Sequence, residues 1–308
     1  MATTDKQGRK GGADGTEGGL LAQVWDILKT VFWALLIAAA FRSFLFQPFS
    51  IPSGSMKPTL LVGDYLFVTK YSYGYSNFSF PFAPDLFEGR IWSTMPQRGD
   101  VVVFKHPRRD ACSEGPITTV SNFVTSIVSR RVVGANDCED FVKRVVGLPG
   151  DRVAVIDGVP HVNGEPLKTE RIVDFVEIKR EMGSPPQMPN CINDPVATGG
   201  ACLKEQYRET FPGGTPVHNV LNIQGTVGSA GSGSRSQADN MPERVVPAGE
   251  YFFMGDNRDN SRDSRFPSVG MVPFENLIGR ADVIVVSSEG SFLEFWKWRG
   301  DRFFKSIE

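Results

Sequence analysis

The rhythm of hydrophobic and polar positions changes twice along the chain. Residues 1–19 are glycine-rich and polar, which predicts a disordered start. The uncharged run TVFWALLIAAAF follows, between Lys29 and Arg42. After Leu60, short stretches of β-branched and aromatic residues alternate with Gly, Pro, Asp and Asn, as is typical of strands and turns. A helical rhythm does not return until residues 291–306, so the pattern predicts a mostly β protein behind one N-terminal helix.

The apolar run is shorter than a membrane span. Its 12 residues extend over about 18 Å as a helix, whereas a bilayer core needs about 20 residues. Flanking apolar residues lengthen it to residues 20–46, and we predict a transmembrane anchor there. A cleaved secretory signal and a buried core helix are the alternatives. Basic residues before the run predict a cytoplasmic N-terminus, with the rest of the chain on the outer (periplasmic) side of the cytoplasmic membrane.

Changes in composition divide the remainder of the chain. We predict a β-domain at 47–173 with an insertion at 105–139, an inserted β-rich subdomain with loops at 174–246, and a continuation of the β-domain at 247–290. Asn163-Gly164 predicts a hairpin turn. The C-terminal segment, 291–308, mixes aromatic and basic residues. We favour a place on a membrane surface for it over packing on the body.

Charge and cysteine content narrow the function. The chain has 33 Lys and Arg against 35 Asp and Glu, a formal charge of −2, which does not favour a nucleic-acid partner. The four cysteines lack metal-site spacing, and no metal is expected. Outside the cytoplasm they would form the local pairs Cys112–Cys138 and Cys191–Cys202, whereas in the cytosol they would be four free thiols.

A serine-rich loop, FSIPSGSMKPTL at 49–60, directly follows the apolar segment. A serine hydroxyl needs a base to become a nucleophile, and none of the three histidines lies in a motif-like setting. A lysine with a pKa lowered by burial is the other common base. Lys143 lies in the apolar strand pattern DFVKRVVGLPGD, on the side of Phe141 and Val145. The alternative is an edge-strand lysine that extends into water.

A third cluster, MGDNRDNSRDSR at 254–265, has the start of a calcium-binding loop. Ser264 and Gly270 stand where such a loop needs Gly and Glu, so calcium is excluded. The alternative interpretation of this cluster is a charged surface turn with exposed ion pairs.

Taken together, these segments resemble the bacterial type I signal peptidases, also called leader peptidases. The resemblance covers FQPFSIPSGSMKPTL at 46–60, RGDVVVF at 98–104, FVKRVVGLPGD at 141–151, GDNRDNSRDSR at 255–265 and the later VPFENLIGRA. It implies an antiparallel β-sheet catalytic body of signal-peptidase type with a second, inserted β-rich subdomain. It also implies a Ser-Lys endopeptidase that cleaves signal peptides from exported preproteins without a cofactor. Membrane lipid is an expected partner, and the protein-export channel is a further one.

The resemblance also implies roles for individual residues. Ser55 is the acylating nucleophile and Lys143 the general base. Ser53 shares the oxyanion hole with the backbone N–H of Ser55, and Ser261 orients the lysine amine. The supporting turn and its ion pairs comprise Gly255, Asp256, Arg144, Asp263 and Arg265. The substrate strands and small apolar pockets comprise Ile51, Pro52, Met56, Leu60, Phe141 and Val142.

One position departs from the family pattern, because Arg262 stands where a small residue is common. Two other functions are compatible with the same residues. One is a Ser-Lys self-cleaving regulator, although the predicted span and the lack of a DNA-binding region argue against it. The other is a non-catalytic anchored β-domain that binds exported chains.

Overall fold

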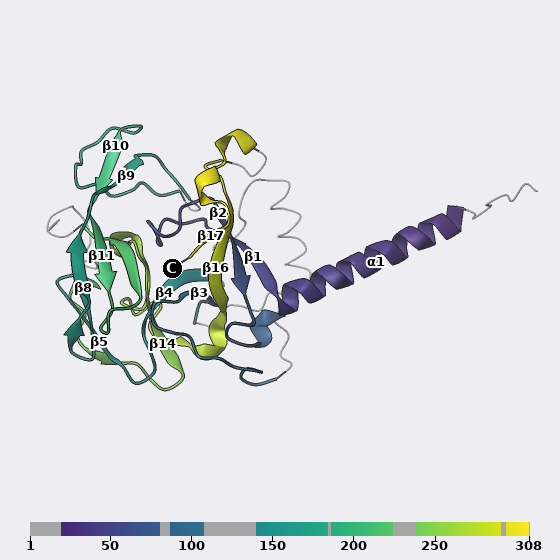
Figure 1. Cartoon of the computed structure of the whole chain (residues 1–308), viewed down its shortest axis with the longest axis horizontal. Helices are drawn as coiled ribbons and strands as arrows, with labels where there is room; N and C mark the ends of the chain where they lie inside the picture. The colour runs from purple at the N-terminus through teal and green to yellow at the C-terminus, as the bar shows by residue number, and fades with distance from the viewer. Residues whose placement is uncertain are drawn as a thin grey trace, which may run out of the picture. The chain divides into compact units, whose positions relative to one another are not determined.

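The computed structural model describes residues 20–80, 87–107, 140–183, 186–223, 238–290 and 294–307 (Figure 1). Most of the predicted insertion, with the predicted Cys112–Cys138 pair, lies outside these residues. The chain forms two units, Met1–Phe41 and Arg42–Glu308.

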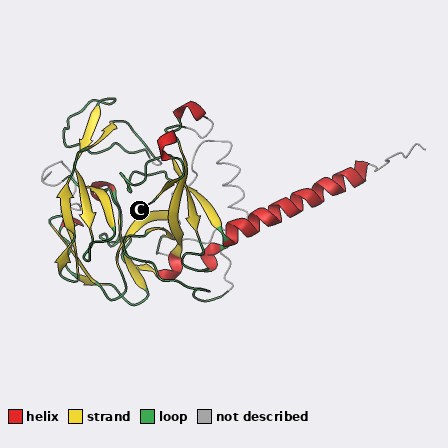
Figure 2. Ribbon diagram, viewed as in Figure 1, coloured by secondary structure: helices red, strands yellow, loops and turns green. Residues whose placement is uncertain are grey.

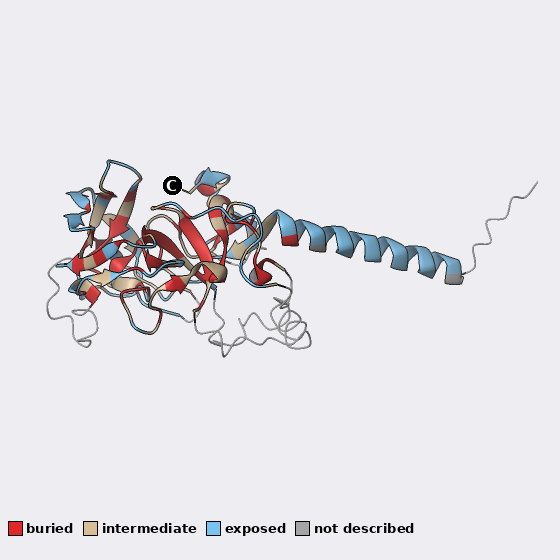
Figure 3. Ribbon diagram, turned by 90° about the horizontal axis from the view of Figure 1, so that it is seen from below, coloured by how far each residue is buried: buried red, intermediate tan, exposed pale blue. Residues whose placement is uncertain are grey.

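Helix α1, Leu20–Phe44, carries the apolar run. Its large apolar side chains are exposed, among them Trp25, Phe32 and Leu35 (Figure 3). Within the described residues, no helix combines the length and the apolarity needed to cross a membrane. The predicted transmembrane anchor is therefore not confirmed.

The largest sheet is antiparallel and curled, and it has eight strands in the order β1-β2-β16-β3-β4-β14-β15, with β17 paired to β16 (Figures 1 and 2). The strands are β1 (Phe46–Ser50), β2 (Asp64–Thr69), β3 (Val101–Lys105), β4 (Asp140–Gly147), β14 (Glu250–Met254), β15 (Val272–Pro273), β16 (Leu277–Ser287) and β17 (Lys305–Ser306). Strand β16 shifts register against both of its long neighbours, and such irregularities bend a strand and increase its twist. The predicted mostly β fold is confirmed.

The described residues also form three smaller sheets. Their orders are β13-β5-β6-β7, β12-β11-β8 and β10-β9. The strands are β5 (Arg152–Ile156), β6 (Val159–Val162), β7 (Glu165–Pro166), β8 (Lys168–Arg171), β9 (Phe175–Ile178), β10 (Ala201–Lys204), β11 (Gln206–Thr210), β12 (Val217–Leu221) and β13 (Arg244–Val245). The segment 174–246 is β-rich as predicted, but β11 and β13 pair with β8 and β5 outside it. The segment therefore shares its sheets with strands outside its predicted bounds.

Short 3₁₀ helices occupy several turns: η1 (Asn77–Ser79), η3 (Arg258–Asn260), η4 (Phe274–Asn276), η5 (Phe295–Lys297) and η6 (Gly300–Arg302). Asn163 and Gly164, both with positive φ, form the turn between β6 and β7, as predicted. The predicted disulfide Cys191–Cys202 is present.

The C-terminal segment differs from its helical expectation, since its described part has 3₁₀ turns and then strand β17. The Arg302 guanidinium binds the buried Asp64 carboxylate at 2.6 and 3.1 Å, which ties the segment to the body. Phe295, Trp296 and Phe304 remain exposed. The segment thus packs on the body through one face and presents aromatic side chains on another.

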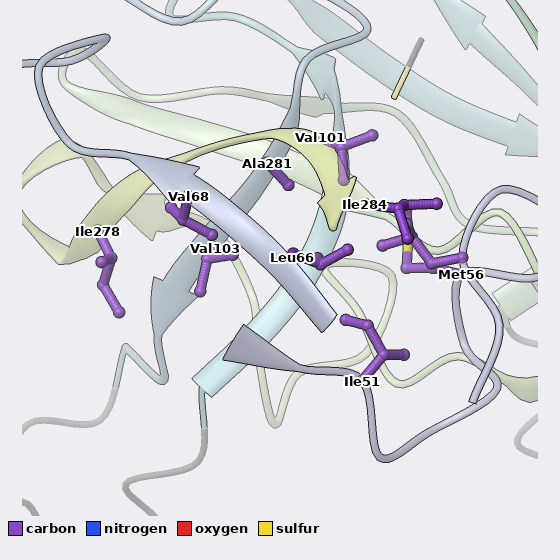
Figure 4. Close-up of a cluster of buried hydrophobic side chains, with 10 residues drawn as sticks. Ile51, Met56, Leu66, Val68, Val101, Val103, Ile278, Ala281 and Ile284 are labelled. Carbon is purple, nitrogen blue, oxygen red and sulfur yellow. The ribbon is translucent and has the colours of Figure 1, made fainter. Parts of the chain in front are cut away.

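One apolar cluster of the body also holds the serine-rich loop. Ile51 and Met56 extend from the loop into a cluster with Leu66, Val101 and Ile284 (Figure 4). Both side chains are buried. Because burial of such a side chain is worth about 1.5–3 kcal/mol, these two residues fix the loop between them to the sheet.

Candidate active site

The loop that carries Ser55 is fastened on both sides of the serine. The backbone N–H of Leu60 donates to the carbonyl of Met56 at 2.9 Å. Asn257 donates its backbone N–H to the Ser55 carbonyl at 3.0 Å and its side-chain amide to the Gly54 carbonyl at 2.9 Å. Asn257 was not assigned a role from the sequence, although it lies within the motif at 255–265.

Lys143 lies on β4, between β3 and β14, so it is not on an edge strand. Its Nζ is 2.8 Å from Ser55 Oγ and 2.9 Å from the carbonyl of Val142. The side chain is buried, which excludes the alternative of a lysine extended into water. Burial lowers the pKa of Lys143 to about 8, although the carboxylates of Asp263 and Asp256 oppose the shift. A fraction of the amine is therefore neutral near physiological pH.

Ser53 is exposed, whereas the neighbouring Ser55 is buried. Its Oγ is 3.3 Å from Ser55 Oγ. A hydroxyl at this distance is close enough to donate a hydrogen bond to an oxygen that develops charge beside Ser55.

Two buried ion pairs support the site from behind. Arg144 donates from Nε and Nη2 to the two carboxylate oxygens of Asp256, each at 2.8 Å. Burial alone would raise the pKa of Asp256, but the Arg144 guanidinium holds it below its usual value. Arg265 binds Asp263 in the same two-point manner, at 2.9 and 3.0 Å, and likewise keeps the Asp263 pKa low despite burial. Ion pairs with two parallel hydrogen bonds also fix the orientation of both side chains.

The turn at Gly255 approaches the loop closely. A Cβ added at Gly255 would lie 2.2 Å from Ser261 Oγ and 2.6 Å from the carbonyl oxygen of Ser55. Ser261 Oγ is buried and has no well-formed hydrogen bond among the described residues, although Ser261 helps to lower the pKa of Asp263. No bond from Ser261 to Lys143 is found there, so its orienting role stays a prediction.

Arg262, the position that departs from the family pattern, is exposed, and its guanidinium lies 5.6 Å from the Phe141 ring centroid. Its charge contributes to the lowered pKa of Lys143.

The predicted substrate-contacting residues divide by burial. Ile51, Met56, Leu60 and Phe141 are buried in the two adjoining apolar clusters, whereas Pro52 is exposed and Val142 is half-buried. The first four therefore support the site as core residues in this structure, and the last two are open to a bound chain.

Several buried charges were not found from the sequence. Arg258 binds Glu209 with Nη1 at 2.7 Å, and Lys57 binds Glu177. His218 lies beside Glu209, and burial lowers the pKa of His218. Within the described ranges, no group of three or more His, Cys, Asp or Glu side chains is arranged to hold a metal ion.

Comparison with known proteins identifies the family of the chain. Residues 24–286 match the family described as "Signal peptidase, peptidase S26". Signal peptidase I of Rickettsia canadensis is 34% identical over 274 residues, which cover 87% of this chain and 81% of the relative. Signal peptidase I of Rickettsia typhi is 36% identical over 263 residues, which cover 83% and 78%.

Among solved structures, a crystal structure of a signal peptidase I from Enterococcus faecalis V583 aligns with 61% of this chain and 97% of its own chain. The sequence identity is 20% and the TM-score is 0.26. The family match and the relatives together establish that the chain belongs to the signal peptidase family, peptidase S26, and is a peptidase hydrolase of that family.

Proposed function

We propose that the protein removes signal peptides from exported preproteins with Ser55 as nucleophile and Lys143 as general base. The observation that carries the proposal is the 2.8 Å distance between Lys143 Nζ and Ser55 Oγ, together with a buried amine whose pKa is about 8. Proton transfer to a base works best when the pKa of the base lies near the working pH.

The reaction then follows from the groups at the site. Lys143 takes the proton of Ser55 as Oγ attacks the scissile carbonyl. The Ser55 N–H and the Ser53 hydroxyl donate to the oxyanion, and one such donor is worth about 3 kcal/mol of transition-state stabilisation. The lysine returns the proton to the leaving amine, which frees the mature chain and leaves an acyl-enzyme. The same amine then activates the water that hydrolyses the ester.

The substrate enters as an extended strand. Main-chain hydrogen bonds to an added strand set the register of a peptide, and pockets for alternate side chains set its specificity. Small residues before the cleaved bond suit shallow pockets at the exposed Pro52 and the half-buried Val142, and the buried side chains of Ile51, Met56, Leu60 and Phe141 support these pockets from the core. The supporting turn and its ion pairs keep Lys143 and the serine-rich loop in place. These residues are Gly255, Asp256, Arg144, Asp263, Arg265 and Ser261.

The same proposal includes a membrane location. The segment 20–46 is the anchor, the N-terminus is cytoplasmic, and the catalytic body lies on the periplasmic side with lipid and the export channel as neighbours. Support comes from the exposed apolar side chains along α1, because a large exposed apolar surface is typical of contact with a membrane or a partner protein.

The test uses the full chain in detergent and a β-lactam-like acylating probe, read by intact mass. Wild-type protein should gain one probe mass at Ser55, and Ser55→Ala and Lys143→Ala should gain none and cleave no preprotein. Lys168→Ala, which removes an exposed lysine of β8, is the matched control and should behave as wild type. A folded wild-type protein that is never acylated would favour the non-catalytic binding domain, and cleavage restricted to its own chain would favour the self-cleaving regulator.

A further inference from the structure

A second lysine lies almost beside the nucleophile. Lys57 follows Ser55 by two residues, yet its side chain is buried and forms an ion pair with the Glu177 carboxylate. Burial lowers the pKa of Lys57, and Glu177 opposes that shift. The proposed chemistry has no use for this lysine, so its burial calls for another explanation.

The carboxylate belongs to a remote part of the chain. Glu177 is on β9, and Lys204 of the paired strand β10 binds the same carboxylate at 3.0 Å. Directly across from Glu177 in the register lies Cys202, which is joined to Cys191 by the disulfide. Glu177 therefore pairs across the β9–β10 ribbon with a residue that the disulfide ties to the connection between the two strands.

The stem of Lys57 supports the turn that precedes Ser55. Its Cε and Cδ lie 3.3 and 3.6 Å from where a Cβ of Gly54 would be, and its backbone N–H donates to the Gly54 carbonyl at 3.3 Å. A pocket on this side of the turn has Gly54, Lys57, Met182, Pro189, Lys204 and Asn260 in its lining. The segment that carries β9 and β10 thus meets the nucleophile loop at this pocket and through the buried Lys57–Glu177 ion pair.

We infer that Glu177 is a positioning residue for the nucleophile: it holds Lys57 folded under the turn at residues 54–57 and so keeps Ser55 Oγ against Lys143. The inference rests on the proposed function. Without the carboxylate, Lys57 would be a buried cation that shares its surroundings with Lys204, and its amine would turn outward to water. A nucleophile displaced by about 1 Å loses on the order of 100-fold in rate.

The test measures acylation of Ser55 in the full chain by the β-lactam-like probe. In Glu177→Gln, the maximal acylation rate should fall about 10- to 100-fold, while the probe concentration for half-maximal rate changes by less than about threefold. Adding Lys57→Met should recover most of the loss, because an apolar side chain of similar length packs under the turn without a counter-charge. If Glu177→Gln only destabilised strands β9 and β10, adding Lys57→Met would not restore the acylation rate.

Two controls separate positioning from general damage. Lys179→Ala removes the exposed Lys179–Asp194 ion pair of the same segment and should leave the rate unchanged. If Glu177→Gln fails to fold, Glu177→Asp replaces it and should show a smaller loss of the same kind. A wild-type rate in the folded Glu177 variant, or no recovery on adding Lys57→Met, would overturn the inference while leaving the proposed function intact. No acylation of the wild-type protein would instead refute the proposed function.

Discussion

At the residue scale, Lys143 is subject to opposing influences. Burial removes water from the amine and lowers its pKa to about 8, the carboxylates of Asp263 and Asp256 raise the pKa, and the cations Arg262 and Arg265 lower it further. Because only the neutral amine accepts the serine proton, activity should be lost as pH falls below this pKa and be fully present above it.

The pH profile of the reaction should therefore have one acid limb. The kcat/KM for a preprotein or peptide should rise about tenfold per pH unit below pH 8 and level off above it. Arg262→Ala removes a nearby cation, which should raise the pKa of Lys143 and move the limb to higher pH, while Arg262→Lys should leave it in place. Steady-state kinetics between pH 6 and 10 give the profile. A flat profile, or a limb that moves to lower pH in Arg262→Ala, would contradict the assignment of Lys143 as the base.

At the element scale, the disulfide ties the connection between β9 and β10 to strand β10, because Cys191 lies in that connection and Cys202 lies on β10. Cys191 and Cys202 are separated by 11 positions, and no other sheet neighbour pairs with β9 or β10 among the described strands. A two-stranded ribbon of this kind is marginally stable alone. Closing such a loop is worth about 3 kcal/mol in the chain-entropy account.

We therefore expect replacement of both cysteines by serine to loosen this ribbon locally. Hydrogen exchange at amides of residues 175–178 and 201–204 should accelerate by up to about 100-fold, the equivalent of that free energy. The buried strands β3 and β4 provide an internal control and should keep their protection. Equal acceleration in β3 and β4 would show that the disulfide stabilises the whole body instead.

At the scale of the whole molecule, the unit Arg42–Glu308 contains both members of the serine–lysine pair and the ion pairs behind them. Among its described residues it also has three clusters of buried apolar side chains: the two beside the site and a third around Phe252. A unit with its own core is expected to fold alone.

A chain that begins at Arg42 should therefore fold and be acylated at Ser55 at a rate within about twofold of the full chain. The full chain should float with lipid vesicles, and the shortened chain should do so less, because it lacks the apolar side chains of α1. Intact mass and vesicle flotation supply the two measurements. Failure of the folded short chain to be acylated would mean that the preceding residues contribute to the site.

Local sequence patterns carried much of the fold and the site. Alternating residues marked the strands, Asn163-Gly164 marked a turn, and the motifs around Ser55 and Lys143 suggested the chemistry, because each of these signals lies within a few neighbouring residues. Family membership is confirmed, whereas the individual catalytic roles remain proposals. The C-terminal segment was misread as helical because its aromatic spacing fits a helix, while pairing with β16 and the Arg302–Asp64 ion pair favour 3₁₀ turns and a strand.

Contacts between distant segments depended on the tertiary structure. Ser55 and Lys143 are 88 positions apart, and Lys57 and Glu177 are 120 apart. Asn257 fastens the serine loop from yet another segment. Whether a lysine is neutral, and which carboxylate it meets, depends on the burial and charge that converge from all of these segments, and no stretch of sequence contains that information by itself.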